Sequence, residues 1–382
     1  MADLAVAFLA AEEVDAIEIP FLLQILDGKR QRRDIPKVKA PFVKDVAFHY
    51  TPSVFRTHFR LSPGIVEELM MELQTHYSSQ AGTWWPLQEA LLACLWTLGN
   101  LEPYESVAER FSTSRSDLSS HIHAVCRVIA SRCQQRITWP RQADAQRIER
   151  AFRRAGFPHT LAVVDACHVR IVKPQEEDCP EEYFNCKEFY SLNLTAFTDP
   201  GGSFLHINVD HPGSWPDARV FRQTDVARVL ERTPQLLLPD GMHLIGDSAY
   251  PLSQHLMTPF GARSLTAPQK RYNRRLLAAA AAAGRAFGLL KSRFRRLNSL
   301  HMQPVRSSRA AVTACCVMHN MSLEAGEEPM EPGLQPLRDQ IHQEAEENLP
   351  QTTPPCARDT PSATHSDCTL CIAANSQLCI KK

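Results

Sequence analysis

Long apolar runs are missing from this chain of 382 residues. No stretch reaches the roughly 18 consecutive apolar residues that a membrane-spanning helix needs. The first residues also lack lysine and arginine and contain acids at Asp3, Glu12 and Glu13, unlike the basic start of a secretory signal peptide. The sequence therefore predicts neither a membrane span nor secretion.

Net charge is missing as well, because 42 Lys and Arg residues balance 42 Asp and Glu residues. The charges are unevenly spread, however, and Lys270 to Arg309 contains eleven basic residues and no acid. Lysine and arginine supply most contacts to DNA phosphates, so this segment predicts DNA contact, although a solvated helix face would have the same composition. A second cluster, Lys29–Arg33, fits either a nuclear-import signal or a surface loop.

Closely spaced cysteine pairs are scarce, although the chain has twelve cysteines. Most lie among apolar neighbours, as small core residues do in a reducing compartment. Cys368 and Cys371 form a single CxxC near His365 and Cys379, but no second pair stands at the usual zinc spacing. We therefore expect free thiols in an intracellular protein of the nucleus, with the cytoplasm as a second compartment, and regard zinc as weakly indicated.

Two aspartates end apolar runs that predict buried strands. Asp165 follows Leu161–Val164, and Asp247 follows Met242–Gly246. Carboxylates that are brought together repel each other unless a cation lies between them. Mg²⁺ and Mn²⁺ prefer such oxygen ligands, so the pair predicts a divalent metal site. The alternative is that each aspartate is only a turn residue or a helix N-cap.

Several segments around these aspartates resemble the Harbinger family of transposases and the nuclease-like proteins derived from them. The segments are Val164–Ile171, Phe189–Asn193, Gly246–Leu252, Arg285–Phe294 and Cys315–Asn320. The resemblance covers roughly residues 50–323. It implies an α/β, RNase H-like mixed sheet with flanking helices, which cuts DNA with an Asp-Asp-Glu triad and two metal ions. It also implies a separate Myb-like DNA-binding partner protein.

Carried over by this resemblance, the two aspartates of the triad fall on Asp165 and Asp247. The glutamate immediately precedes the Arg-Ala-Phe-Gly run, where this chain has Gly284. Each ion of a two-metal site needs anchoring ligands, and the preceding residues, Ala278–Ala283, offer no acid in another register. Trp215–Phe221 also matches a family segment, in which Asp217 reads as a helix N-cap.

The chain divides into four parts on composition and pattern. They are an N-terminal arm and linker (1–60), a helical, helix-turn-helix-like domain (61–145), an RNase H-like nuclease domain (150–323) and an acidic, Pro-, Ser- and Thr-rich tail (324–382) expected to be disordered. In the nuclease part we expect strands near 161–172, 189–198, 203–210 and 242–247. Helices are expected near 217–231 and 276–298.

A helix-turn-helix is predicted within the helical part. Glu105–Phe111 forms a short helix, and Ser114 caps a second helix with Asp117 three residues later. The apolar face of that helix carries Leu118, Ile122, Val125, Cys126 and Ile129, and its polar face carries Arg115, Ser116, Ser119, Ser120, His123 and Arg127. The polar face suits a DNA major groove, but helical hairpins that do not touch DNA have the same pattern.

These observations leave three functional hypotheses. The preferred one is a transposase-derived, DNA-binding protein that has kept the nuclease fold while Gly284 leaves cleavage weak or lost. The expected DNA contacts are Arg115, Ser119, His123, Arg285, Lys291, Arg293, Arg295 and Arg296. The alternatives are an active endonuclease with a substitute metal ligand and a protein-interaction scaffold that does not bind DNA. The oligomeric state does not follow from the sequence.

Overall fold

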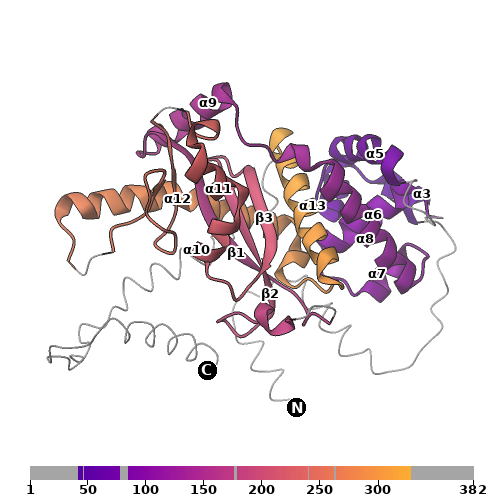
Figure 1. The fold of residues 1–382 in the computed structure, drawn as a ribbon. Helices are drawn as coiled ribbons and strands as arrows, with labels where there is room; N and C mark the ends of the chain where they lie inside the picture. Colours follow the sequence, from indigo (N-terminus) through magenta and orange to yellow (C-terminus); the bar gives the residue numbers. More distant parts are fainter. Residues whose placement is uncertain are drawn as a thin grey trace, which may run out of the picture. The chain divides into compact units, whose positions relative to one another are not determined.

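The computed structural model describes residues 42–45, 47–77, 85–175, 179–239, 241–261 and 264–327, which belong to one compact unit (Figure 1). The basic cluster Lys29–Arg33, the Cys368/Cys371 pair and most of the tail lie outside these residues. The first part of the described chain is helical. Its helices are α3 (Phe42–Asp45), η1 (Ala47–His49), α4 (Pro52–Phe59), α5 (Pro63–Tyr77), α6 (Leu87–Gly99), α7 (Tyr104–Arg110), α8 (Arg115–Arg132), η2 (Gln134–Arg136) and α9 (Gln142–Arg154).

A mixed sheet follows, as expected from the sequence. Its strands are β1 (Thr160–Arg170), β2 (Ser191–Thr198), β3 (Phe204–Pro212), β4 (His243–Ile245) and β5 (Leu256–Met257), in the order β3-β2-β1-β4-β5. The first three pair antiparallel, while β4 is parallel to β1 and β5 is parallel to β4. The remaining helices are η3 (Pro180–Tyr183), α10 (Asp217–Gln223), α11 (Asp225–Arg232), η4 (Pro234–Leu236), α12 (Ala267–Arg293), η5 (Arg295–Asn298) and α13 (Val305–Glu324).

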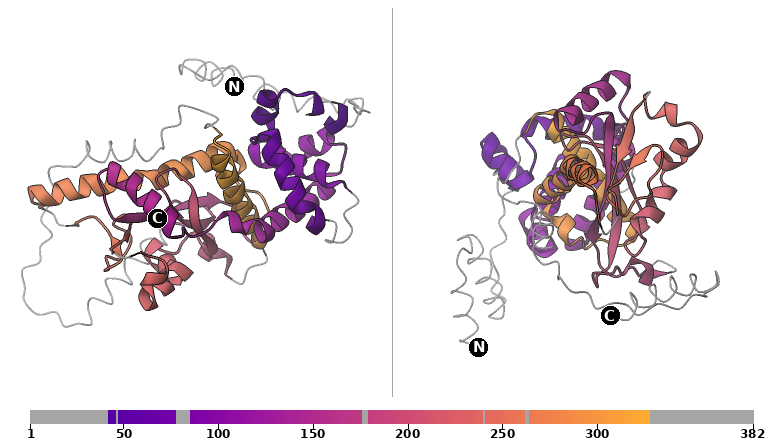
Figure 2. Two further views of the ribbon diagram at one scale, coloured as in Figure 1. Left: turned by 90° about the horizontal axis from the view of Figure 1, so that it is seen from above. Right: turned by 90° about the vertical axis from the view of Figure 1, so that its left-hand side faces the viewer.

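Helices cover both faces of the sheet. On one face, the Phe204 ring lies 6.0 Å from that of Phe287 on α12 and 5.1 Å from that of His319 on α13. On the other face, the Phe197 ring lies 6.3 Å from that of Phe221 on α10. The right-hand view of Figure 2 shows α10 and α11 on the opposite side of the sheet from α12. Because both faces are covered, the first seven residues of β1 and β2 include almost no exposed side chain.

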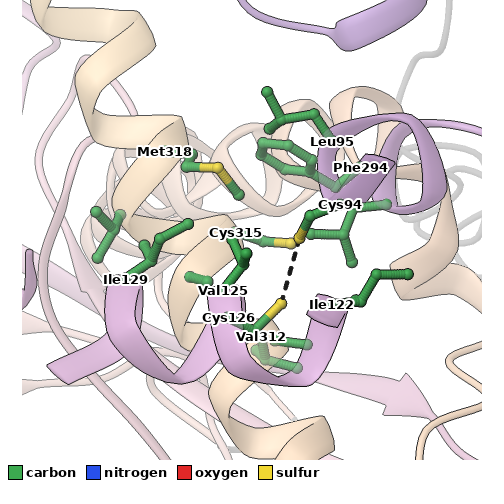
Figure 3. Close-up of a cluster of buried hydrophobic side chains, with 14 of the residues drawn as sticks. Cys94, Leu95, Ile122, Val125, Cys126, Ile129, Phe294, Val312, Cys315 and Met318 are labelled. Carbon is green, nitrogen blue, oxygen red and sulfur yellow. Dashed lines mark hydrogen bonds between the residues drawn. The ribbon is translucent and has the colours of Figure 1, made fainter. Parts of the chain in front are cut away.

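The helical part and the sheet share one hydrophobic core. Helix α13 packs along α8, and Cys315 on α13 lies in the same cluster as Cys94 on α6 and Cys126 on α8 (Figure 3). The Cys94 and Cys126 sulfurs are 3.6 Å apart, a hydrogen bond between free thiols. Burial raises the pKa of Cys315 well above its usual value, so this thiol stays protonated. The eight described cysteines are all free, in agreement with the expectation from sequence.

Two helices differ from the sequence expectation. Thr224 ends α10 and its hydroxyl accepts a hydrogen bond from the Ala227 N–H, so the single helix expected near 217–231 is two helices. Helix α12 begins at Ala267 rather than near 276, because Thr266 and Gln269 form a capping box at its start. Within the described part of the chain, no helix is long and apolar enough to cross a membrane.

Candidate functional site

Asp165 lies in the middle of β1 rather than at a strand end, and Asp247 follows the end of the neighbouring parallel strand β4. Val163 pairs with Ile245 in the register of β1 and β4, and each aspartate follows two residues later. Parallel strands lie about 4.8 Å apart, so the sheet brings the two backbone positions side by side. Asp165 is buried and Asp247 is half-buried. One oxygen of Asp165 accepts the Ala166 N–H at 2.7 Å, and one oxygen of Asp247 accepts the Ala249 N–H at 2.9 Å.

Gly246 lies in tight packing beside this pair. A Cβ at this position would lie 3.0 Å from Val164 Cγ1 and 3.0 Å from the Tyr250 ring, so these two side chains would have to shift slightly to admit one. The absence of a side chain therefore suits the close packing of β4 against β1.

Helix α12 carries Gly284 past Asp165. The strand partner of Asp165, Ala196, shares a core with Ala286 and Phe287, so Asp165 is on the face that α12 covers. The Lys291 ammonium donates to the His168 carbonyl at 2.7 Å and fixes the helix along β1. Counting back from that contact, three residues of strand and seven of helix both span about 10 Å, so a helix aligned with the strand would have Gly284 near the level of Asp165.

The space at Gly284 is open. A Cβ added there would meet nothing within 4 Å, so a side chain at this position has room to extend. Among the described residues, no three His, Cys, Asp or Glu side chains are close enough together to hold a metal ion. The two aspartates offer hard oxygen ligands that suit one divalent cation. They do not fit two ions, because each ion would need further anchoring ligands from the protein.

The basic residues of α12 divide into exposed and internal ones. Five cations on the helix are exposed, and only alanine, leucine and glycine separate the first four from the last. They are Lys270, Arg271, Arg274, Arg275 and Arg285. Of the residues expected to contact DNA, Arg285 is therefore accessible, whereas Lys291 and Arg295 are half-buried and Lys291 is engaged with the His168 carbonyl.

The expectation that Arg293 and Arg296 contact DNA is wrong. Arg293 donates to the Arg60 carbonyl at 2.8 Å and to the Glu327 carboxylate at 2.9 Å, and only 4% of its surface is exposed. Arg296 is buried as well and donates to the carbonyls of Thr97 and Glu102. These guanidiniums are bonded to groups of the helical part of the chain and, for Arg293, to Glu327 after α13, so neither points to the surface where a phosphate would bind.

The predicted helix-turn-helix is present as α7, a turn and α8. Ser114 accepts the Asp117 N–H at 3.0 Å and so caps α8, as expected. The expected apolar face of α8 is buried, together with His121, whose ring nitrogen bonds the Tyr77 hydroxyl at 2.8 Å. On the polar face, Arg115 is exposed and forms an ion pair with Glu105 at 3.0 Å.

Two other residues of that polar face are less accessible. Ser119 and His123 are half-buried, and burial lowers the pKa of His123. Asp217 also differs from expectation, because Pro216 occupies the N-cap position of α10. Asp217 is the first helical residue, and its carboxylate accepts a hydrogen bond from the Asn193 side chain at 3.0 Å.

Sequence reasoning did not assign roles to His319 and Asn320 at the end of the Cys315–Asn320 motif. The His319 imidazole bonds the Gly202 carbonyl at 3.0 Å, and the Asn320 side chain bonds both the N–H and the carbonyl of Phe204. They tie α13 to the turn between β2 and β3, where Gly202 lies against Ala286 of α12. The signal in the sequence was two polar residues within an apolar helix.

Comparison with known proteins identifies relatives of this chain. Residues 164–320 match the family described as DDE superfamily endonuclease, and residues 40–131 match a domain of unknown function. "Protein ALP1-like" of Arabidopsis thaliana is 25% identical over 304 residues, covering 77% of this chain and 71% of the relative. "Putative nuclease HARBI1" of Homo sapiens is 33% identical over 230 residues, covering 58% of this chain and 62% of the relative. No solved structure matches.

The chain contains a DDE superfamily endonuclease domain, and its mixed sheet and flanking helices are those of an RNase H-like fold. The chain is distantly homologous to the vertebrate proteins named "Putative nuclease HARBI1" and to the Arabidopsis protein. The match spans less than two thirds of the length of the human relative.

Proposed function

We propose that this protein binds DNA along the exposed basic surface of α12 and that cleavage at Asp165 and Asp247 is weak or lost. The proposal rests on Gly284, which stands where the family resemblance expects the third carboxylate and whose Cβ position has no other atom within 4 Å. Two carboxylates hold a single divalent ion, Mg²⁺ or Mn²⁺, with modest affinity. The second ion, which would stabilise the other reacting oxygen, lacks its anchor.

The charge on α12 supports the DNA-binding half of the proposal. Lys270, Arg271, Arg274, Arg275 and Arg285 are exposed on one helix that contains no acid. The small side chains of Ala278 and Ala281 lie between these cations. A phosphate backbone can approach closely over such small residues while the guanidiniums on either side contact it.

The cellular context is proposed from the family resemblance. The protein would act in the nucleus together with a separate Myb-like DNA-binding protein. That partner would recognise the target sequence, because contacts between α12 and phosphates carry no sequence information. The polar face of α8 is the other candidate for base contacts, with Arg115 exposed and Ser119 and His123 at its edge.

Cleavage of supercoiled plasmid in Mg²⁺ or Mn²⁺ tests the lost activity. We expect background cutting by the wild type and metal-dependent cutting by Gly284→Glu. Gly284→Gln is the matched control, since it has nearly the same shape but no charge. Adding Asp165→Ala or Asp247→Ala to Gly284→Glu should abolish the gain. If the wild type cuts as well as Gly284→Glu, another residue anchors the metal and the proposal fails.

Salt-dependent binding to duplex DNA tests the surface. Replacing Lys270, Arg271, Arg274 and Arg275 by Gln should weaken binding equally for unrelated sequences. It should also reduce the slope of log affinity against log salt, by about 0.9 for each phosphate that the protein no longer neutralises. Arg222→Gln with Arg232→Gln, exposed on α10 and α11 across the sheet, is the control and should change neither. An unchanged slope in the α12 variant would show that these charges do not contact DNA.

A further inference from the structure

A cavity of about 390 Å³ lies at the other end of β1 and β4 from the aspartates. Phe157 and His159, from the loop before β1, form one wall, His243 at the start of β4 forms another, and the first turns of α12 close it. From α12 come Tyr272 and two arginines, Arg271 and Arg275. The volume is within the range of sites that hold a small organic ligand, about 300–1,000 Å³.

Flat rings make up much of the cavity wall. The Phe157 ring lies 5.5 Å from that of Tyr272 and 5.9 Å from that of His243, in edge-to-face arrangements. Burial raises the pKa of Tyr272 and lowers the pKa of His243, so both rings stay neutral near pH 7. Neutral rings held at fixed angles offer faces on which another flat ring can stack.

The rim of the cavity is cationic. Arg271 and Arg275 are exposed, and none of the residues that line the cavity carries a carboxylate. Within the described ranges, neither guanidinium forms an ion pair. Both arginines can therefore bind an anion from outside the protein. Together with the aromatic lining, they suit a ligand that contains both a flat ring and a negatively charged group.

The cavity is in line with the aspartate pair. Nine residues of α12 separate Arg275 from Gly284, about 14 Å, and six residues of β1 separate His159 from Asp165, about 20 Å. At the duplex rise of about 3.4 Å per nucleotide, this is about four to six nucleotides of one strand.

We propose that this cavity binds one unpaired DNA base together with its neighbouring phosphates, at a fixed distance along the strand from Asp165 and Asp247. The inference rests on the proposed function, because it takes α12 as the surface that the strand follows. The base stacks against the half-buried Tyr272 ring, which the buried Phe157 ring supports from behind, while Arg271 and Arg275 contact the phosphates. A base in a paired duplex cannot enter, so the cavity distinguishes unpaired or extruded nucleotides from duplex.

Fluorescence anisotropy with two single strands of 12 nucleotides tests the proposal. One strand is oligo(dT), and the other has the same phosphates but abasic sugars throughout. The wild type should prefer oligo(dT) by about 5- to 160-fold, the range for stacking one base on an aromatic side chain. Tyr272→Leu should lose most of that preference, whereas Tyr272→Phe should keep it. Arg271→Gln with Arg275→Gln should weaken both strands alike.

Photocrosslinking gives a second measurement that does not depend on stability. An oligo(dT) with one 5-iodouracil should crosslink to the peptide that carries Phe157 or the one that carries Tyr272. Crosslinks confined to other peptides would overturn the proposal, as would equal affinity for both strands. A third outcome would also overturn the proposal. An acidic peptide that contains phenylalanine could displace oligo(dT) from proteins with Tyr272 but not from Tyr272→Leu, while the wild type binds oligo(dT) and the abasic strand equally. That result would assign the cavity to a protein ligand.

The outcomes distinguish the cavity proposal from the proposal that α12 binds duplex DNA. If duplex binding depends on the α12 charges but oligo(dT) and the abasic strand bind equally, only the cavity proposal fails. Oligo(dT) binding that depends on Tyr272, without duplex binding, keeps the cavity and removes the duplex surface.

Discussion

Gly284 and Arg293 lie on one helix, two and a half turns apart, in opposite surroundings. The position of Gly284 opens on empty space, whereas the Arg293 side chain is surrounded by groups from α4 and the end of α13. Sequence alone treats both as members of a basic helix. The difference arises because Arg293 binds two residues that are distant in the sequence. Arg60 is more than two hundred residues away from Arg293, and Glu327 is 34 residues away.

Arg293→Gln tests this internal role. The Arg293 and Glu327 side chains are 5% and 7% exposed. Without Arg293, the buried Glu327 carboxylate keeps its ion pair with Arg56 at 3.4 Å, so its charge is still compensated. We expect a loss of about 1.5–3 kcal/mol in unfolding free energy, the contribution of a hydrogen bond to a charged group. Arg285→Gln, on the exposed side of the same helix, should change it by less than about 0.5 kcal/mol. Urea unfolding measures both, and equal small effects would show that the Arg293 ion pair contributes little.

The sequence pattern placed both aspartates at strand ends, which holds for Asp247 and not for Asp165, and it did not predict the burial of the arginines. Asp247 follows β4, whereas Asp165 lies in the middle of β1, because that strand continues to Arg170. The register that pairs Val163 with Ile245 needed the structure. Arg296 bonds backbone carbonyls of the helical part, for which no sequence pattern exists.

Among the elements, α8 separates its two faces clearly. Replacing Ser116, Ser119, Ser120 and His123 by Ala should leave thermal stability nearly unchanged and alter sequence preference if this face contacts bases. Ile122→Ala on the buried face should instead cost about 2–5 kcal/mol. Thermal unfolding and binding to a randomised duplex library measure the two effects. Strong destabilisation by the polar-face variant would show that this face is part of the core.

Helix α13 is attached to the β2–β3 turn through a histidine that is fully buried. Burial lowers the pKa of His319 from 6.5 to about 4. Between these values the unfolded chain binds a proton that the folded chain does not, so stability falls as pH falls from 6.5 toward 4. The difference amounts to about 3 kcal/mol.

His319→Gln removes this titration while keeping an amide that can donate to the Gly202 carbonyl. We expect the variant to be less stable than the wild type at pH 7 and to lose less stability between pH 7 and pH 4.5. Other buried histidines titrate in both proteins, so the difference between the two curves isolates His319. Parallel curves would mean that the pKa of His319 is the same in the folded and unfolded states.

Element types were easier to predict from sequence than element ends. The long strands and α8 follow from apolar periodicity, which reads local burial. The break at Thr224 and the early start of α12 depend on side-chain caps at Thr224 and Thr266. Each cap needs only one hydroxyl oriented toward an amide, and threonine is common enough that its presence alone does not predict a boundary.

At the scale of the whole molecule, the helical part and the sheet are one packed unit. Composition placed a boundary between 145 and 150, yet α13 from the far end of the chain packs against α8. Cys94, Cys126 and Cys315 lie together in that core (Figure 3). This packing joins segments about two hundred residues apart in the sequence. Sequence periodicity shows which face of a helix is buried but not which distant segment covers that face.

A fragment of residues 141–327 should therefore fail to fold cooperatively. It retains every strand but exposes the α13 face that α8 covers, and it leaves Arg293 and Arg296 without the carbonyls of Arg60, Thr97 and Glu102. We expect a broad, non-cooperative thermal transition and binding of a hydrophobic dye, in contrast to a single sharp transition for residues 41–327. Adding a separate fragment of residues 41–140 should restore the sharp transition, since the shared core can form between two chains. A sharp transition of the 141–327 fragment alone would show that the sheet and its helices are stable without α8, and that the packing of α13 on the helical part is a docking contact between two domains.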